Sequence, residues 1–71
     1  MKNRVRLYRH IAGLNQETLA KRAGITRQTL SLIEKGEYNP SLKLCMALCL
    51  ALGRNLNDLF WMEGEDVEEN F

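Results

Sequence analysis

Five side chains between Arg27 and Leu32 could read the edges of nucleic-acid bases if they belong to one helix that enters the groove. Arginine can fork onto the acceptors of guanine, glutamine can bond adenine through two atoms, and leucine can cover a thymine methyl group. A helix beginning at Arg27 turns Thr29, Leu30 and Ile33 to one side and long polar side chains to the other. The same face could simply be a solvated helix surface, which is the usual meaning of such residues. The candidates for base readout are Arg27, Gln28, Thr29, Ser31 and Leu32.

A second helix is expected to position that face through a tight turn. Gly24 directly follows a run of apolar helix periodicity, and glycine readily takes the positive φ at which many helices end. Ala20 is small enough to let another helix cross close by. Thr26 can cap the following helix by accepting a backbone N–H. Gln16–Lys35 is therefore expected to form two short amphipathic helices around the turn.

The segments GLNQETLA, GITRQT, IEKGEYNPSL and ALGRNLNDLF carry these spacings, and the chain resembles the Cro and phage-repressor type of helix-turn-helix regulators. This group is called the XRE family, and the similarity to its small single-domain members runs from about Asn3 to Trp61. It implies an all-α fold, a compact five-helix lambda-repressor-like DNA-binding domain, in some members with a short pair of strands from the two chain ends. Helices are expected over Arg4–Ala12, from Gln16 to the turn, from Arg27 onward, and over Leu42–Leu52 and Leu56–Phe60.

In this family the helix that begins at Arg27 enters the major groove, and neighbouring residues hold the DNA backbone without reading sequence. A glutamine at the position of Gln16 contacts a phosphate there, although the residue could also be an ordinary exposed first-turn side chain. Tyr38 could reach a phosphate or pack under its loop. The resemblance implies backbone contacts from Gln16, Thr26, Lys35, Tyr38, Asn39, Ser41 and Lys43.

An arginine on the core side of the first helix needs a partner, because a buried guanidinium is tolerable only when it is paired. Helix spacing turns Val5, Tyr8, Arg9 and Ala12 toward the core. Glu34 is the partner expected for Arg9, and the corresponding positions are paired in the repressors that this chain resembles.

Several apolar residues are expected to meet another chain. Leu42–Leu52 is apolar nearly all round, and Ala47 and Leu50 replace residues that are usually charged in related sequences. A partner subunit could cover them, or the monomer core could be roomier. Leu7 and Ile11 also lie where the family usually has charged residues. They could meet the chain termini, another subunit or a protein partner. The expected dimer interface comprises Leu50, Leu56, Leu59 and Trp61.

The chain has 71 residues, near the lower limit for unaided folding, so dimerisation would help it. Residues 1–43 hold nine Lys or Arg against three acids, a net charge of +6, whereas residues 44–71 have a net charge of −5. The basic half contains the base-reading candidates. Residues 1–62 are expected to form the DNA-binding and dimerisation domain and residues 63–71 an acidic, mobile tail. The chain has no membrane-length apolar run and no secretion leader, so we expect a cytoplasmic protein with no membrane partner.

Catalysis and metal binding are not expected. Cys45 and Cys49 are four residues apart, but the single histidine, His10, lies on another helix and a structural zinc needs four ligands. Buried thiols are favoured over a redox or metal sensor, and no cofactor is expected. The sequence predicts a non-enzyme that binds double-stranded DNA as a homodimer and represses transcription at a palindromic operator. An antitoxin that also binds a toxin and a protein-bridging module are the alternatives.

Overall fold

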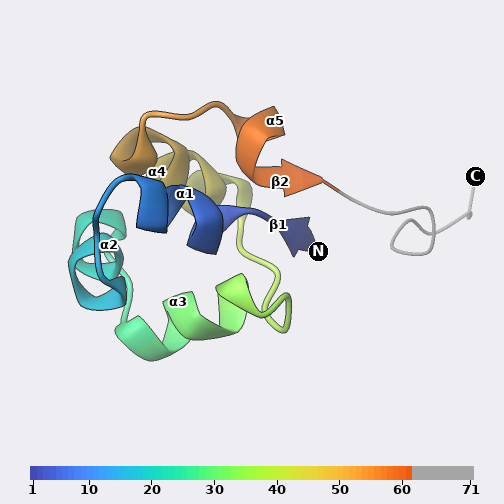
Figure 1. Ribbon diagram of the computed structural model, residues 1–71. Coiled ribbons are helices and arrows are strands. Elements are labelled where there is room, and N and C mark those ends of the chain that lie inside the picture. The colour runs from blue at the N-terminus through green and yellow to red at the C-terminus, as the bar shows by residue number, and fades with distance from the viewer. Residues whose placement is uncertain (62–71) are drawn as a thin grey trace, which may run out of the picture.

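Five helices and one short pair of strands follow one another along residues 1–61, the part of the chain that the computed structural model describes (Figure 1). Their order is β1 (Lys2–Asn3), α1 (Val5–Ile11), α2 (Gln16–Ala23), α3 (Arg27–Glu34), α4 (Leu42–Leu52), α5 (Leu56–Leu59) and β2 (Phe60–Trp61). The predicted five-helix fold is confirmed, and a strand pair joins the two ends of the domain. The strands are antiparallel, with Lys2 opposite Trp61 and Asn3 opposite Phe60. The predicted acidic tail lies outside the described residues.

Side-chain caps fix where four of these helices begin. At each start, a side-chain oxygen accepts the backbone N–H three residues further on, which satisfies one of the otherwise unpaired donors of the first turn. Gly24 ends α2 with φ at +76°, a left-handed conformation that glycine adopts without a Cβ clash. Local chemistry therefore sets the α2–α3 turn. The capping residues are Asn15, Thr26, Ser41 and Asn55.

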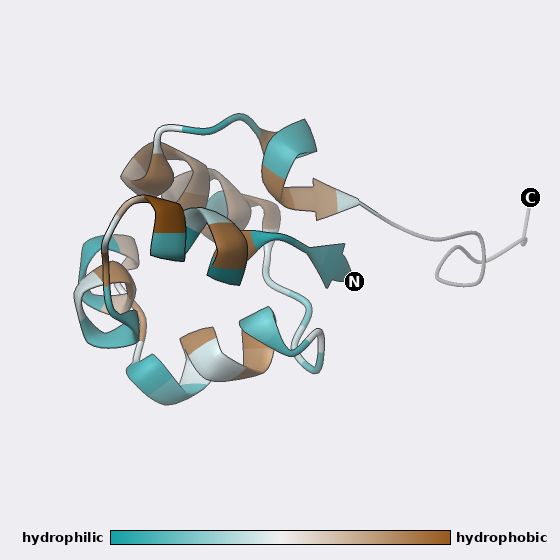
Figure 2. Ribbon diagram, in the orientation of Figure 1, coloured by the Kyte–Doolittle hydropathy of each residue, from teal (hydrophilic) through white to brown (hydrophobic). Residues whose placement is uncertain are grey.

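One apolar core holds the helices together. α4 runs behind α1 in Figure 1, and Figure 2 shows hydrophobic residues along most of its length. Leu48 of α4 is fully buried and belongs to one core cluster with side chains from the other helices, including Leu19 of α2 and Leu30 of α3. Burial of this apolar surface stabilises the angle between α2 and α3. The buried apolar residues are Val5, Leu19, Ala20, Leu30, Ile33, Cys45, Leu48, Cys49, Leu59 and Phe60.

The ends of α1 and α5 differ from the sequence-based expectation. Ala12 is exposed and does not face the core, because α1 ends at Ile11 and the chain turns away there. Phe60 is not the last residue of α5. Its backbone is extended, with φ −130° and ψ 140°, because it pairs with Asn3 in the strand ladder. Within residues 1–61, none of the helices combines the length and the apolar content needed to cross a bilayer.

Candidate nucleic-acid interface

The outer face of α3 carries four of the five residues selected for base readout. Arg27 and Gln28 are exposed, Leu32 is 40% exposed, and Ser31 is half-buried at the edge of the face. These four residues line one shallow hollow of about 270 Å³. The hollow offers a guanidinium, an amide, a hydroxyl and an apolar group side by side, which is a set of groups that can distinguish base edges in a major groove.

Thr29 lies apart from those four residues. Its hydroxyl is 3.0 Å from the hydroxyl of Thr26, and its backbone N–H donates to the same Thr26 oxygen at 3.1 Å. Thr29 is half-buried and does not line the hollow. The two threonines therefore fix the start of α3, and they hold Arg27 and Gln28 in the first turn of a capped helix.

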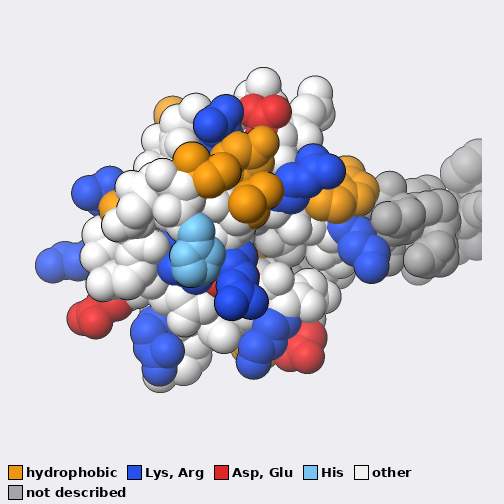
Figure 3. All heavy atoms as spheres, in the orientation of Figure 1, with side chains coloured by type: hydrophobic (Ala, Val, Ile, Leu, Met, Phe, Trp, Pro, Cys, Tyr) orange, Lys and Arg blue, Asp and Glu red, His pale blue; other side chains and the backbone are white. Residues whose placement is uncertain are grey.

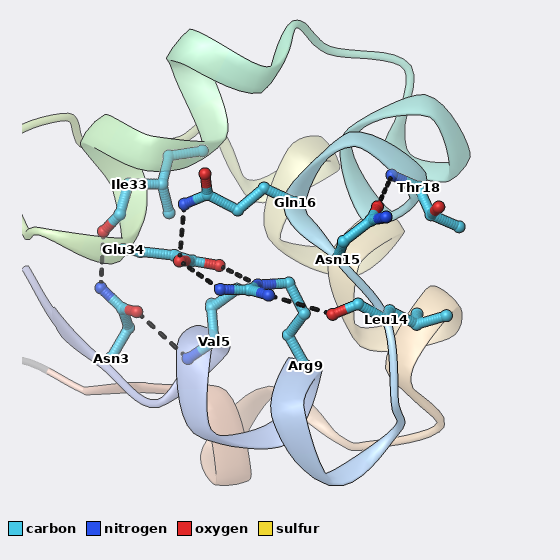
Figure 4. Close-up of polar contacts among 9 residues, drawn as sticks. All are labelled: Asn3, Val5, Arg9, Leu14, Asn15, Gln16, Thr18, Ile33 and Glu34. Atoms are coloured by element: carbon cyan, nitrogen blue, oxygen red, sulfur yellow. Dashed lines mark hydrogen bonds and ion pairs between the residues drawn. The ribbon is translucent and has the colours of Figure 1, made fainter.

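A buried ion pair joins α3 to α1 (Figure 4). Arg9 Nε donates to Glu34 Oε2 at 2.8 Å and Arg9 Nη2 donates to Glu34 Oε1 at 3.2 Å, which is the fork geometry that suits guanidinium and carboxylate. The remaining Arg9 nitrogen donates to the carbonyl of Leu14 at 3.0 Å. Gln16 Nε2 adds a third bond to the carboxylate, at 3.1 Å from Oε1. The pair expected from the sequence is present, and it ties α1 and the start of α2 to the end of α3.

An open groove of about 550 Å³ runs between α1, the start of α2, and α3, with the ion pair at its floor. Arg27 and Lys35 line it from α3 and its C-terminal cap. Arg6 and His10 line it from α1, and sequence reasoning did not select them. The available signal was their spacing, because residues four apart on a helix lie on the same face.

The segment after α3 places the remaining backbone candidates at the surface. Tyr38, Asn39 and Lys43 are exposed, and Asn39 Oδ1 accepts a hydrogen bond of 3.2 Å from the amino group of Met1. The hydroxyl of Ser41 accepts the N–H of Leu44 at 3.2 Å and so caps α4. These exposed positions are compatible with phosphate contacts, which remain a prediction here.

The residues expected at a dimer interface divide into two groups. Leu50 is 84% exposed, Leu56 is also exposed, and Trp61 is half-buried with the guanidinium carbon of Arg4 4.6 Å from its ring centroid. Leu59 is fully buried in the monomer core. The assignment of Leu59 to the interface was wrong, because the single turn of α5 points that side chain inward and no partner can reach it.

The exposed apolar surface of α4 is larger than sequence reasoning indicated. Leu42, Met46 and Leu50 follow one another at four-residue spacing, and all three are more than half exposed. Beside them, an apolar hollow of about 260 Å³ is lined in part by Leu42, Leu56 and Trp61. Contiguous apolar surface of this kind is uncommon on a monomer and typically marks an interaction site.

The two cysteines are buried, free thiols. Burial raises the pKa of Cys45, and the neighbouring Cys49 thiol raises it further. Burial also raises the pKa of Cys49, with a smaller contribution from Asp58. Both groups are therefore protonated and weakly nucleophilic near neutral pH. No three potential ligands gather into a metal site within residues 1–61.

Comparison with known proteins agrees with this geometry. A family model described as Helix-turn-helix matches residues 5–59. An uncharacterized HTH-type transcriptional regulator of Bacillus subtilis (strain 168), YgzD, is 46% identical over 66 residues, which are 93% of this chain and all of the relative. A second uncharacterized HTH-type transcriptional regulator, MJ0272 of Methanocaldococcus jannaschii, is 44% identical over 66 residues, which are 93% of this chain and all of the relative.

Among solved structures, the restriction-modification controller protein C.AhdI from Aeromonas hydrophila superposes with a TM-score of 0.76 at 38% identity, covering 80% of this chain and 86% of that one. The DNA-binding domain of SinR from Bacillus subtilis superposes with a TM-score of 0.70 at 29% identity, covering 76% and 80%. These relatives are regulators and not enzymes. The chain therefore belongs to the helix-turn-helix family of DNA-binding transcriptional regulators.

Proposed function

We propose that this protein is a sequence-specific repressor that binds a palindromic operator as a homodimer, with α3 of each subunit in the major groove. The observation that carries the proposal is the outer face of α3. Arg27, Gln28, Ser31 and Leu32 share one hollow there, and the helix beneath is held by caps and by a buried ion pair. Rigid placement of such side chains is what base readout requires.

The charge distribution supports the same orientation. Residues 1–43 carry a net charge of +6 and contain α3 and the phosphate candidates, whereas residues 44–71 carry −5. Phosphate attracts the first region and repels the second, which favours α3 as the face that meets the duplex. Phosphate contacts from Gln16, Lys35 and Lys43 would fix the register of α3 on the DNA.

The α4 surface supports a homodimer. Leu42, Met46, Leu50 and Leu56 present an apolar face that a second copy can cover, and so small a domain gains stability from such burial. A twofold dimer sets two copies of α3 about 34 Å apart, one turn of DNA, so the operator is palindromic. DNA binding and dimerisation then both lie within residues 1–62 of a cytoplasmic protein. Repression follows because the protein on the operator blocks polymerase sterically.

Selection of duplexes from a random library tests base readout most directly. A palindromic consensus with two half-sites one helical turn apart is expected. Gln28→Ala should then lower affinity for the selected site by roughly 1–3 kcal/mol and leave affinity for random DNA nearly unchanged. Recovery of no consensus would overturn sequence-specific binding and would favour a protein-bridging role. Equal losses on both duplexes would place Gln28 among the phosphate contacts.

A second candidate function is an antitoxin that regulates its own gene and also holds a toxin. The observation that favours it is the face of α1, where Leu7 and Ile11 are more than half exposed and lie outside the groove and outside the α4 surface. Such an apolar pair suits a protein partner. Purification from the native host tests it: a stoichiometric small basic partner that Leu7→Glu releases supports the antitoxin, and a partner-free protein argues against it.

A further inference from the structure

The groove beside α3 has a second basic wall, which α1 supplies. Arg6 and His10 stand one turn apart on α1, both are exposed, and both line the groove opposite Arg27 and Lys35. Figure 3 shows this side of the molecule, with Lys and Arg side chains next to the histidine on its lower side and hydrophobic side chains above it. We propose that Arg6 and His10 bind phosphates of the DNA strand lying in this groove, which makes α1 part of the DNA-binding surface. The inference rests on the proposed function, because the phosphates belong to the duplex that α3 reads.

The electrostatics of the groove favour an anion. At its floor, Arg9 and Glu34 neutralise each other, and their side chains are only 8% and 4% exposed. The Glu34 carboxylate already accepts bonds from Arg9 and Gln16. Among the described residues that line the groove, Glu17 is the remaining acid. Residues 1–15 contain no Asp or Glu at all, so the α1 wall carries positive charge without local compensation.

The shape of the groove favours a duplex over a small ion. Arg27 and Ser31 line both the groove and the hollow on the outer face of α3. A single ligand that occupies both spaces can touch α3 with its base edges and α1 with its backbone. DNA has this geometry, because its phosphates border the groove in which its base edges are exposed.

Salt-dependent binding measures the phosphate contact. Arg6→Gln should weaken binding to the selected operator and to random duplex alike, by roughly eightfold per lost contact at 0.1 M salt. The slope of log K against log salt should become shallower by about 0.9 for each protomer bound. Arg6→Lys should restore the slope, because it keeps the charge. His10→Ala should also weaken both duplexes, and by less, because an imidazole offers one donor toward the groove where a guanidinium offers several.

Arg54→Gln is the matched control. It removes the same charge from an exposed arginine whose guanidinium carbon lies 4.5 Å from the centroid of the Tyr8 ring, outside the groove. Its slope should stay close to that of the wild type. Equal changes in Arg6→Gln and Arg54→Gln would assign the effect to net charge and would overturn the inference. Thermal melting of each variant checks that the fold is intact, as expected for exposed side chains.

Three further results separate the inference from the proposed function. If Arg6→Gln leaves the salt slope unchanged while Gln28→Ala still lowers operator affinity, the α1 contact is wrong and the repressor stands. If wild-type protein binds no duplex, both fail. If inorganic phosphate at constant ionic strength shifts the NMR signals of Arg6 and His10 and DNA does not, the groove is a site for a free anion and the inference is overturned.

Discussion

Replacing Arg9 by methionine should lower the free energy of unfolding by about 3–5 kcal/mol, the cost of breaking a buried ion pair from one side. Arg9 is 7% exposed, and it provides two of the three side-chain donors to the Glu34 carboxylate. Methionine keeps much of the apolar stem of arginine, so the loss reports on charge and hydrogen bonds more than on packing. In the variant, the carboxylate stays buried with Gln16 as its remaining side-chain donor.

The loss is large relative to the whole domain. A chain of 71 residues is expected to have a total stability of roughly 4–11 kcal/mol. At about 4–8 °C per kcal/mol for a domain of this size, the melting midpoint should fall by roughly 12–40 °C. Urea unfolding followed by circular dichroism at low temperature keeps the variant measurable. One fixed protomer concentration for all proteins makes their unfolding midpoints comparable, because the stability of a dimer depends on protomer concentration.

The double variant Arg9→Met with Glu34→Leu should recover most of the loss, because the uncompensated charge is gone and apolar groups replace the pair. Arg54→Met serves as the control on an exposed arginine and should cost less than about 1 kcal/mol. The reasoning is refuted if Arg9→Met alone costs less than about 1 kcal/mol, or if the double variant is no more stable than the single one.

Three other predictions concern the dimer, the DNA backbone and the thiols. Leu50→Glu should shift sedimentation from dimer to monomer without changing the helical circular-dichroism signal. The control Leu7→Glu, on α1, should leave the dimer intact. A dimeric Leu50→Glu protein would exclude the α4 surface as the dimer interface. Lys43→Ala should weaken binding to all duplexes and flatten the salt slope by about 0.9 per contact, and a loss confined to the operator would contradict a phosphate role. Because burial raises the pKa of Cys45 and Cys49 above the usual value of 9.0, the folded state holds these protons more tightly than the unfolded state. The contribution of the two thiols to stability is complete below about pH 9 and is lost as pH rises through the folded pKa. Above about pH 9 the urea midpoint of the Cys45→Ala/Cys49→Ala variant should therefore fall less steeply with pH than that of the wild type. The same slope in both proteins would contradict this prediction.

Local chemistry in the sequence determined most of the secondary structure. Thr26 caps the helix that it was expected to cap, because capping depends on a side chain and a backbone N–H only three residues apart. Gly24 ends α2 for an equally local reason. Arg9 with Glu34 was predictable across 25 residues because a buried charge on α1 needed a partner and the family resemblance indicated which one.

Only the tertiary structure decided which element covers each surface. Leu50 and Leu59 are both leucines near the end of apolar segments, yet the first is 84% exposed and the second is fully buried. Helix periodicity gives the direction of a side chain relative to its own axis, and it does not say which neighbour lies in that direction. For the same reason the sequence did not reveal that Arg6 and His10 share a groove with Arg27, because that groove exists only where α1 and α3 come together.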